Sequence, residues 1–198
     1  CGPIAPGPYC NDAFADTYDP AGAETVLTDA GWTKNADGMW ADADGNVPEI
    51  RWMVNTGNTR RESTQEFLIP KLAEAGFNVK ADNCEALPCV FETRLPSLDY
   101  DMAMYISTVA PDPAYLRTWG CDQIPTEEND FQGQNSQGWC NEEATELLIQ
   151  ADAELDPAAR IDQVKQVLAL MAEDHLMLPT LQFPNLGARR TDRVDNAF

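Results

Sequence analysis

The sequence predicts an α/β fold, in which a layered mixed sheet is flanked by helices. Two observations support this class: short apolar strand patterns alternate with amphipathic helical patterns, and proline and glycine separate them. Parallel strands need long crossover connections, which the helices between them would supply. The 198 residues are 43% hydrophobic and 9% aromatic, which excludes intrinsic disorder because such a chain can bury a core.

The helices are predicted from capping residues and from apolar spacing. Asp19 and Pro20 form an N-cap followed by an N1 proline, and Asp156 and Pro157 repeat the pattern near the C-terminus. Long helices are expected over residues 20–30, 59–75, 141–155 and 157–175, with a short one at 90–95.

The helix over 59–75 has a face that we expect to be buried and a face that we expect to contact solvent. The expected buried residues are Phe67, Leu68 and Leu72. The expected solvent-facing residues are Arg60, Arg61, Glu62 and Glu66. Pro70 lies inside the pattern and should kink the helix or begin a second segment.

Strands are predicted over residues 39–41, 49–55, 77–81, 100–108, 178–183 and 187–190. The run at 100–108 is largely apolar and is expected to be a buried strand, although its pattern also fits a helix. Asp42, Asp44 and Gly45 resemble part of a calcium loop, but Trp40 stands where that loop needs an oxygen ligand. A hairpin turn is therefore expected there.

The charge balance excludes two classes of partner. Lys and Arg total 13 against 33 Asp and Glu, for a formal net charge of −20. Nucleic acids and anionic membrane surfaces are bound by cationic neutralisation of phosphates, which this chain opposes.

Six cysteines, Cys1, Cys10, Cys84, Cys89, Cys121 and Cys140, favour disulfides over metal binding. The sequential pairing Cys1–Cys10, Cys84–Cys89 and Cys121–Cys140 closes three short loops, and it is one of several formal possibilities. A zinc site is disfavoured because no CxxC pair occurs and His175 is the single histidine. Cys1 could instead carry a lipid, as in a mature lipoprotein. Disulfides indicate an extracytoplasmic location.

Catalytic motifs are absent from the sequence. No GxSxG, HExxH or GxxxxGK[ST] pattern occurs, and His175 ends a helix, where a cation complements the helix dipole. Two loops could instead bind a ligand, residues 55–58 and 108–113, because each follows a predicted strand. Both loops are equally compatible with ordinary connections.

A run near the N-terminus, YDPAGAE at residues 18–24, continues to Leu27 and to Ala-Gly-Trp at residues 30–32. It is similar to the YDPxxAxxLLxxAGW signature of family 5 extracytoplasmic solute-binding proteins, the receptors of ABC importers for peptides, nickel and oligosaccharides. The resemblance continues through residues 50–54, 72–79, 98–103, 112–113, 156–160 and 173–179. It covers about residues 18–190 in family order.

The resemblance implies the C-terminal lobe of a two-lobed clamshell, a type II (class C) periplasmic-binding-protein fold with ligand in the cleft. Residues 1–18 would be an irregular segment near the crossing between lobes, and residues 19–198 would be the ligand-binding lobe, with the second lobe absent. The implied function is to capture a peptide or other small organic solute outside the cytoplasm and deliver it to an ABC permease. Such receptors are periplasmic or are cell-surface lipoproteins.

The resemblance also implies a set of ligand-binding residues. Peptide-binding members carry an aspartate that pairs with the ligand's α-amine, and Val109 stands at that position here. A valine cannot neutralise an ammonium group in a closed cleft, so the sequence favours a less basic solute, such as a sugar, as the ligand. The expected set is Asn55, Thr56, Asn58, Arg94, Ser107, Thr108, Val109, Asp112, Tyr115 and Trp119. For Arg94 the alternative is a salt bridge, and for Trp119, expected to stack on the ligand, it is core packing.

Two other function classes stay open. One is a secreted hydrolase domain that uses a carboxylate pair, although 33 acidic residues make any single pair uninformative. The other is an acidic, disulfide-stapled interaction module. We expect a binding protein without enzymatic activity, cofactor or metal.

Overall fold

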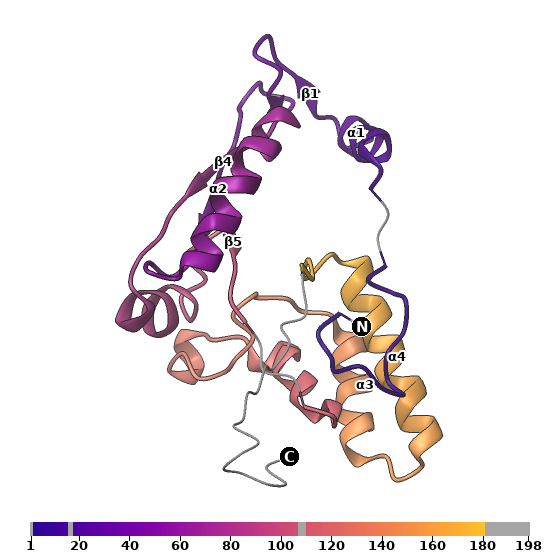
Figure 1. Cartoon of the computed structure of the whole chain (residues 1–198). Helices are drawn as coiled ribbons and strands as arrows, with labels where there is room; N and C mark the ends of the chain where they lie inside the picture. Colours follow the sequence, from indigo (N-terminus) through magenta and orange to yellow (C-terminus); the bar gives the residue numbers. More distant parts are fainter. Residues whose placement is uncertain (1, 16–17, 107–109, 181–198) are drawn as a thin grey trace, which may run out of the picture.

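The computed structural model describes residues 2–15, 18–106 and 110–180, and it confirms the predicted α/β class. Figure 1 shows a sheet covered by a long helix on one side of the molecule and a pair of helices on the other. The strand predicted over 187–190, and that over 178–183 beyond Thr180, lie outside the described residues. Within the described ranges, no helix has the length and apolar character that a membrane span needs.

The main sheet contains β3 (Glu49–Met53), β4 (Asn78–Ala81) and β5 (Met102–Ala103), in the order β4-β3-β5. Both pairings are parallel, as the alternation of strands and helices predicted. The prediction of a long buried strand over 100–108 is wrong, because β5 has two half-buried residues. It pairs only with Trp52 and Met53 of β3, so the backbone leaves the sheet after one short contact.

Helical segments pack on both faces of this sheet, because alternate β3 residues point to opposite sides. Trp52 and Val54 form one small core with Val79, against which Leu68 and Leu72 of α2 (Thr59–Glu74) pack. On the other face, Met53 packs with Val90 of η1 (Ala86–Arg94), a π-helical segment, and with Leu95.

The buried face of α2 is predicted correctly in part: Leu68 and Leu72 pack on the core of the sheet as expected, but two other residues differ. Phe67 is 68% exposed, whereas Arg61, expected in solvent, is 7% exposed. The residues that face the sheet are Arg61, Gln65, Leu68 and Leu72, at intervals of four, three and four. This spacing is that of one face of a helix. The prediction missed Arg61 and Gln65 because it excluded polar residues from the buried face. The helix runs continuously through Pro70.

A two-stranded hairpin lies outside the main sheet. Strands β1 (Thr33–Lys34) and β2 (Trp40–Ala41) pair antiparallel through the turn at residues 35–38. The turn expected at residues 42–46 is present, since the N–H of Gly45 donates to the carbonyl of Asp42 at 3.0 Å. It does not join two paired strands, however, because β2 pairs with β1 and not with β3. The Asp42 carboxylate stabilises the turn by accepting bonds from the backbone N–H groups of Asp44 and Asn46.

The second part of the molecule is built on α3 (Glu142–Ala153) and α4 (Pro157–Glu173), which pack together. The predicted caps are confirmed: Asp156 accepts bonds from the N–H groups that open α4, as Asp19 does for α1 (Pro20–Asp29). The core between α3 and α4 contains Ala144, Leu148, Ala151, Val164, Val167, Leu168 and Met171. Three 3₁₀ segments precede α3: η2 (Pro113–Trp119), η3 (Cys121–Gln123) and η4 (Glu127–Asn129).

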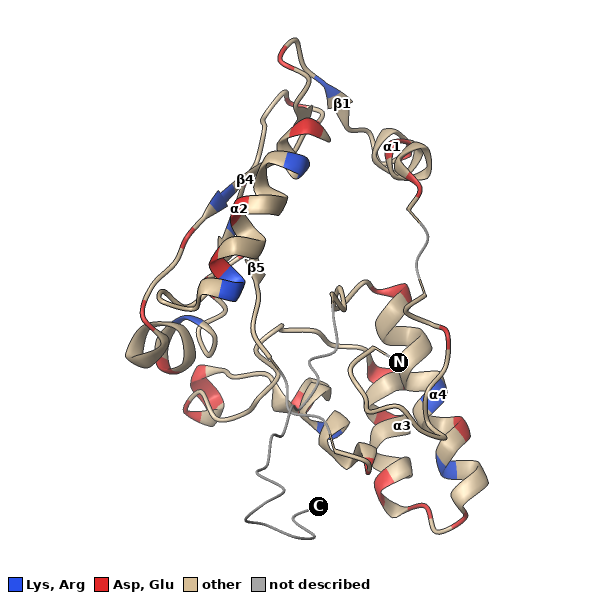
Figure 2. Ribbon diagram, viewed as in Figure 1, with Lys and Arg blue, Asp and Glu red and all other residues tan. Residues whose placement is uncertain are grey.

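Residues 2–15 contain turns and no helix or strand, and they pack on the α3–α4 pair. Ile4 is buried in the core of that pair. The side-chain amide of Asn11 donates to the carbonyl of Lys165 at 3.0 Å. The division into residues 1–18 and 19–198 remains a prediction. Figure 2 shows acidic residues distributed over both parts of the molecule, with basic residues at few positions.

Candidate functional site

The carboxyl ends of β3, β4 and β5 lie at the same edge of the sheet because the strands are parallel. Residues 54–58, 82–85 and 104–106 leave the sheet at this edge. Ligands of open α/β sheets bind in the crevice outside such an edge, so these connections form the candidate site.

The loop at residues 55–58 is fixed by hydrogen bonds. The N–H of Thr56 donates to the carbonyl of Cys84 at 2.8 Å, and Asn55 forms an isolated parallel bridge with Cys84. The Asn58 side chain caps α2 by accepting from the N–H of Arg61 at 3.2 Å, and the Asn55 side chain accepts from the Arg61 guanidinium. Thr56 is exposed, and Asn55 and Asn58 are half-buried. Ligand binding by these three residues stays a prediction.

Sequence reasoning missed a polar pair behind this loop. The Gln65 amide donates to the carbonyl of Trp52 at 2.7 Å and exchanges two bonds with the Asn83 amide, at 3.0 and 2.8 Å. The Asn83 oxygen also accepts from the N–H of Val54 at 3.1 Å. Gln65 is buried and Asn83 is half-buried, and their bonds to each other, to Trp52 and to Val54 join the segments at the carboxyl ends of β3 and β4. Gln65 continues the helical stripe of Leu68 and Leu72, which is the signal that could have found it.

Arg94 is held by partners within the chain. Its guanidinium lies 2.5 Å from the Asp82 carboxylate and 3.5 Å from that of Asp99, and it also donates to the carbonyls of both residues. These partners support the alternative of a salt bridge for Arg94, and its pairing with a ligand stays a prediction. These bonds join the end of η1 to the segments that flank it.

The segment after β5 falls partly outside the described residues, which include none of Ser107, Thr108 and Val109. Beyond it, the Tyr115 hydroxyl donates to the carbonyl of Pro3 at 2.8 Å. Trp119 is 6% exposed and packs in the α3–α4 core. The expectation that Trp119 stacks on a ligand is therefore wrong, because the rest of the core covers its ring.

Asp112 is also paired within the chain. Its carboxylate accepts two bonds from the Arg160 guanidinium, at 2.8 and 2.9 Å, and one from the N–H of Ala114 at 2.9 Å. Arg160 also lies over the ring of Tyr9. The pair joins η2 to α4 and to the N-terminal segment, so the structure gives Asp112 a structural role, and a ligand contact there stays a prediction.

The Asp112–Arg160 pair predicts a pH dependence of stability. The Arg160 guanidinium and the Ala114 N–H lower the pKa of Asp112 from 3.8 to about 2. Since the folded pKa is lowered, the contribution is complete above pH 3.8 and is lost as the pH falls through 2. We expect Asp112→Asn, which retains the helix cap, to cost about 0.5–1 kcal/mol at pH 7, because the 60% exposed carboxylate is screened by solvent. Urea unfolding at a series of pH values measures this difference; one that persists unchanged below pH 2 would contradict the assignment.

Two predicted disulfides are confirmed, Cys84–Cys89 and Cys121–Cys140. Cys1 lies outside the described residues, so the pairing Cys1–Cys10 stays a prediction. The bond Cys84–Cys89 ties the segment after β4 to η1, directly beside Asn55. The disulfide thereby restricts the position of the segment after β4, which borders the candidate site.

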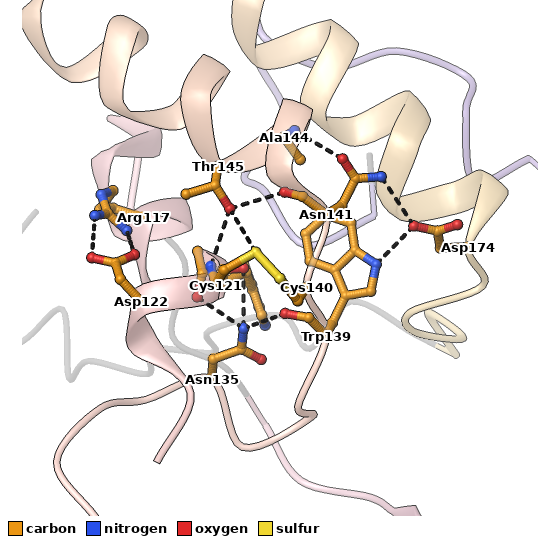
Figure 3. Close-up of a disulfide and its surroundings, with 12 residues drawn as sticks. Arg117, Cys121, Asp122, Asn135, Trp139, Cys140, Asn141, Ala144, Thr145 and Asp174 are labelled. Atoms are coloured by element: carbon orange, nitrogen blue, oxygen red, sulfur yellow. Dashed lines mark hydrogen bonds and ion pairs between the residues drawn. A yellow bond between two sulfur atoms is a disulfide. The ribbon is translucent and has the colours of Figure 1, made fainter. Parts of the chain in front are cut away.

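The other disulfide lies in a hydrogen-bonded network, shown in Figure 3. The Asn135 amide nitrogen lies within 3.1 Å of three carbonyl oxygens, those of Trp119, Gly120 and Trp139. The Trp139 indole donates to the Asp174 carboxylate at 2.8 Å, and the Cys121 N–H donates to the Thr145 hydroxyl at 3.0 Å. These contacts attach the loop over residues 121–140 to both α3 and the end of α4.

Comparisons with known proteins agree with this fold. No family model matches the chain. It is 26% identical over 169 residues to the oligopeptide-binding protein AppA of Bacillus subtilis, covering 85% of this chain and 30% of AppA. An oligopeptide-binding protein of Thermus thermophilus, solved with a pentapeptide, superposes with a TM-score of 0.72 and 29% identity, over 87% of this chain and 31% of that one. NikZ of Campylobacter jejuni, solved with Ni(L-His), gives a TM-score of 0.71 at 22% identity, over 82% of this chain and 31% of NikZ.

The resemblance to solute-binding family 5 is thereby confirmed. The chain spans about 30% of the length of the family 5 relatives that it matches, which is consistent with one lobe. The relatives are binding proteins and not enzymes. The two alternative classes, hydrolase domain and interaction module, gain no support from them.

Proposed function

We propose that this chain is one lobe of the substrate-binding component of an ABC importer, which captures a peptide or other small organic solute without changing it chemically. The observation that carries the proposal is the match to a pentapeptide-bound receptor over 87% of the chain, with a TM-score of 0.72. The rigid edge formed by β3, β4 and their connections supports it, because a receptor needs a preformed surface on each lobe. The second lobe and the permease are the implied partners.

An extracytoplasmic location follows from the same proposal. Disulfides persist in oxidising compartments, and the described residues contain two. The net charge of −20 favours solubility in the presence of counter-ions. Attachment through a lipid at Cys1 and formation of a Cys1–Cys10 disulfide exclude each other, so mass spectrometry of the secreted protein would decide between them.

The test compares this chain with a longer receptor that contains both lobes. A ligand at 100 times its dissociation constant stabilises a folded protein by about 2.7 kcal/mol, which is a clear rise in melting temperature. We expect members of a peptide and oligosaccharide library to stabilise the two-lobed receptor and to shift this chain little, because one lobe offers half of the contacts. A full shift on this chain alone would contradict the half-site.

The same library separates binding from hydrolysis. We expect every peptide and oligosaccharide to be recovered intact after prolonged incubation with the two-lobed receptor. Turnover that follows the purified protein would favour the hydrolase class and would overturn the proposal.

A further inference from the structure

The arginines of the described residues differ in how their charge is balanced. Arg51, Arg94, Arg117 and Arg160 each lie within 4.0 Å of at least one aspartate carboxylate. Arg61 has no such carboxylate in the part of the chain that the structure describes, although the sequence contains 33 acidic residues. A charged side chain that is 7% exposed normally needs an opposite charge, so this exception requires an explanation.

The geometry of Arg61 leaves most of its donors unused. A guanidinium carries five N–H donors, and the described residues provide one acceptor, the side-chain oxygen of Asn55. Burial, and after it the neighbouring positive charge of Arg60, lowers the pKa of Arg61. None of its nitrogens is both fully buried and unbonded, so the unused donors retain contact with solvent. They are therefore reachable from outside the protein.

The position of Arg61 places these donors at the candidate site. It lies in the first turn of α2, whose cap is Asn58, and Asn55 follows β3 at the carboxyl edge of the sheet. Charges of both signs surround these donors. Arg60 and the N-terminus of α2 add positive charge, whereas the Glu62 carboxylate adds a negative charge and is held by the N–H of Gly57 at 3.0 Å. Figure 2 shows basic positions in this first turn of α2.

We propose that Arg61, oriented by Asn55, binds an anionic group of the transported solute, specifically a carboxylate. A carboxylate accepts two parallel bonds from a guanidinium, which matches the donors that Arg61 leaves unused. This inference rests on the proposed function and extends it to a class of solute.

The experiment measures binding to the two-lobed receptor by calorimetry with paired probes. One pair is N-acetylated pentaalanine with a free C-terminal carboxylate and its C-terminal amide. The other pair is xylotriose with and without a glucuronate substituent. We expect the receptor to bind the acidic member of at least one pair about tenfold to a hundredfold more tightly than the neutral member.

Three variants assign this preference to Arg61. Arg61→Gln should remove the preference for the acid while leaving the affinity for the neutral member within about threefold. Arg61→Lys retains the charge but loses the two-pronged donor geometry, so it should retain part of the preference. Lys71→Gln makes the same change of charge at an exposed residue in the last turn of α2, away from the candidate site, and should leave the preference intact.

The outcomes distinguish this inference from the proposed function. Equal binding of acidic and neutral probes by the wild-type receptor overturns the anion site but leaves solute capture standing, and it requires no variant to fold. Equal loss of affinity for both members in Arg61→Gln would mean that Arg61 pairs with a carboxylate of the other lobe, which also overturns it. If the receptor binds none of the four probes, the anion site and the proposed function both fail for these solutes.

Discussion

Replacing Trp119 with alanine is expected to destabilise the folded chain by about 3–5 kcal/mol. The indole is 6% exposed and belongs to the core that also contains Leu116, Leu168 and Met171. Its removal leaves a cavity that the surrounding helices can fill only partly, so the lost contacts add to the lost hydrophobic burial. Urea unfolding followed by circular dichroism measures the change, and tryptophan fluorescence is avoided because the variant alters it.

Tyr18→Ala is the matched control, since Tyr18 is an aromatic residue that is 96% exposed. We expect this change to alter the free energy of unfolding by less than about 0.5 kcal/mol. If Trp119→Ala also stayed within that limit while reducing ligand affinity, the residue would be a ligand-stacking aromatic and the core position would be incorrect.

The case of Trp119 shows what the sequence could predict and what it could not. Helix positions followed from local signals, because Asp19 and Asp156 act as caps through bonds to residues two or three positions away. Whether an aromatic residue faces a core or a ligand depends on segments distant in sequence. Trp119 shares its core with Ile4 and with Met171, and no local pattern contains that information.

The sequence patterns failed to predict the polar residues of the candidate site for a related reason. Arg61 and Gln65 lie on the buried stripe of α2, but hydrophobic periodicity assigns charged and amide side chains to solvent. They are tolerated there because Asn55 and Asn83 supply acceptors from the ends of β3 and β4. Register between a helix and two strands is a tertiary property, so the spacing could have indicated these residues but not their partners.

Removing the Cys121–Cys140 disulfide is expected to destabilise the chain by about 3 kcal/mol. The bond closes a loop with a sequence separation of 19, and without it the unfolded chain gains the conformational freedom that loop closure removes. The double variant Cys121→Ala and Cys140→Ala avoids a free thiol that could form wrong pairs. Urea unfolding under non-reducing conditions, compared with the wild-type protein, measures the difference.

The Cys84–Cys89 bond supplies the internal comparison, because its sequence separation is 5 and the same loop-closure argument gives about 2 kcal/mol.

The two bonds also differ in position, one beside the candidate site and the other beside α3 and α4. We therefore expect removal of Cys84–Cys89 to weaken ligand binding by the two-lobed receptor more than it lowers stability, because Asn55 bridges to Cys84 and orients Arg61. We expect removal of Cys121–Cys140 to lower stability more than it weakens ligand binding. The reason is that Asn135, Trp139 and Thr145 attach the loop of this disulfide to the helical core. Equal effects of the two double variants on both measurements would show that the disulfides act on the fold as a whole and would contradict their separate roles.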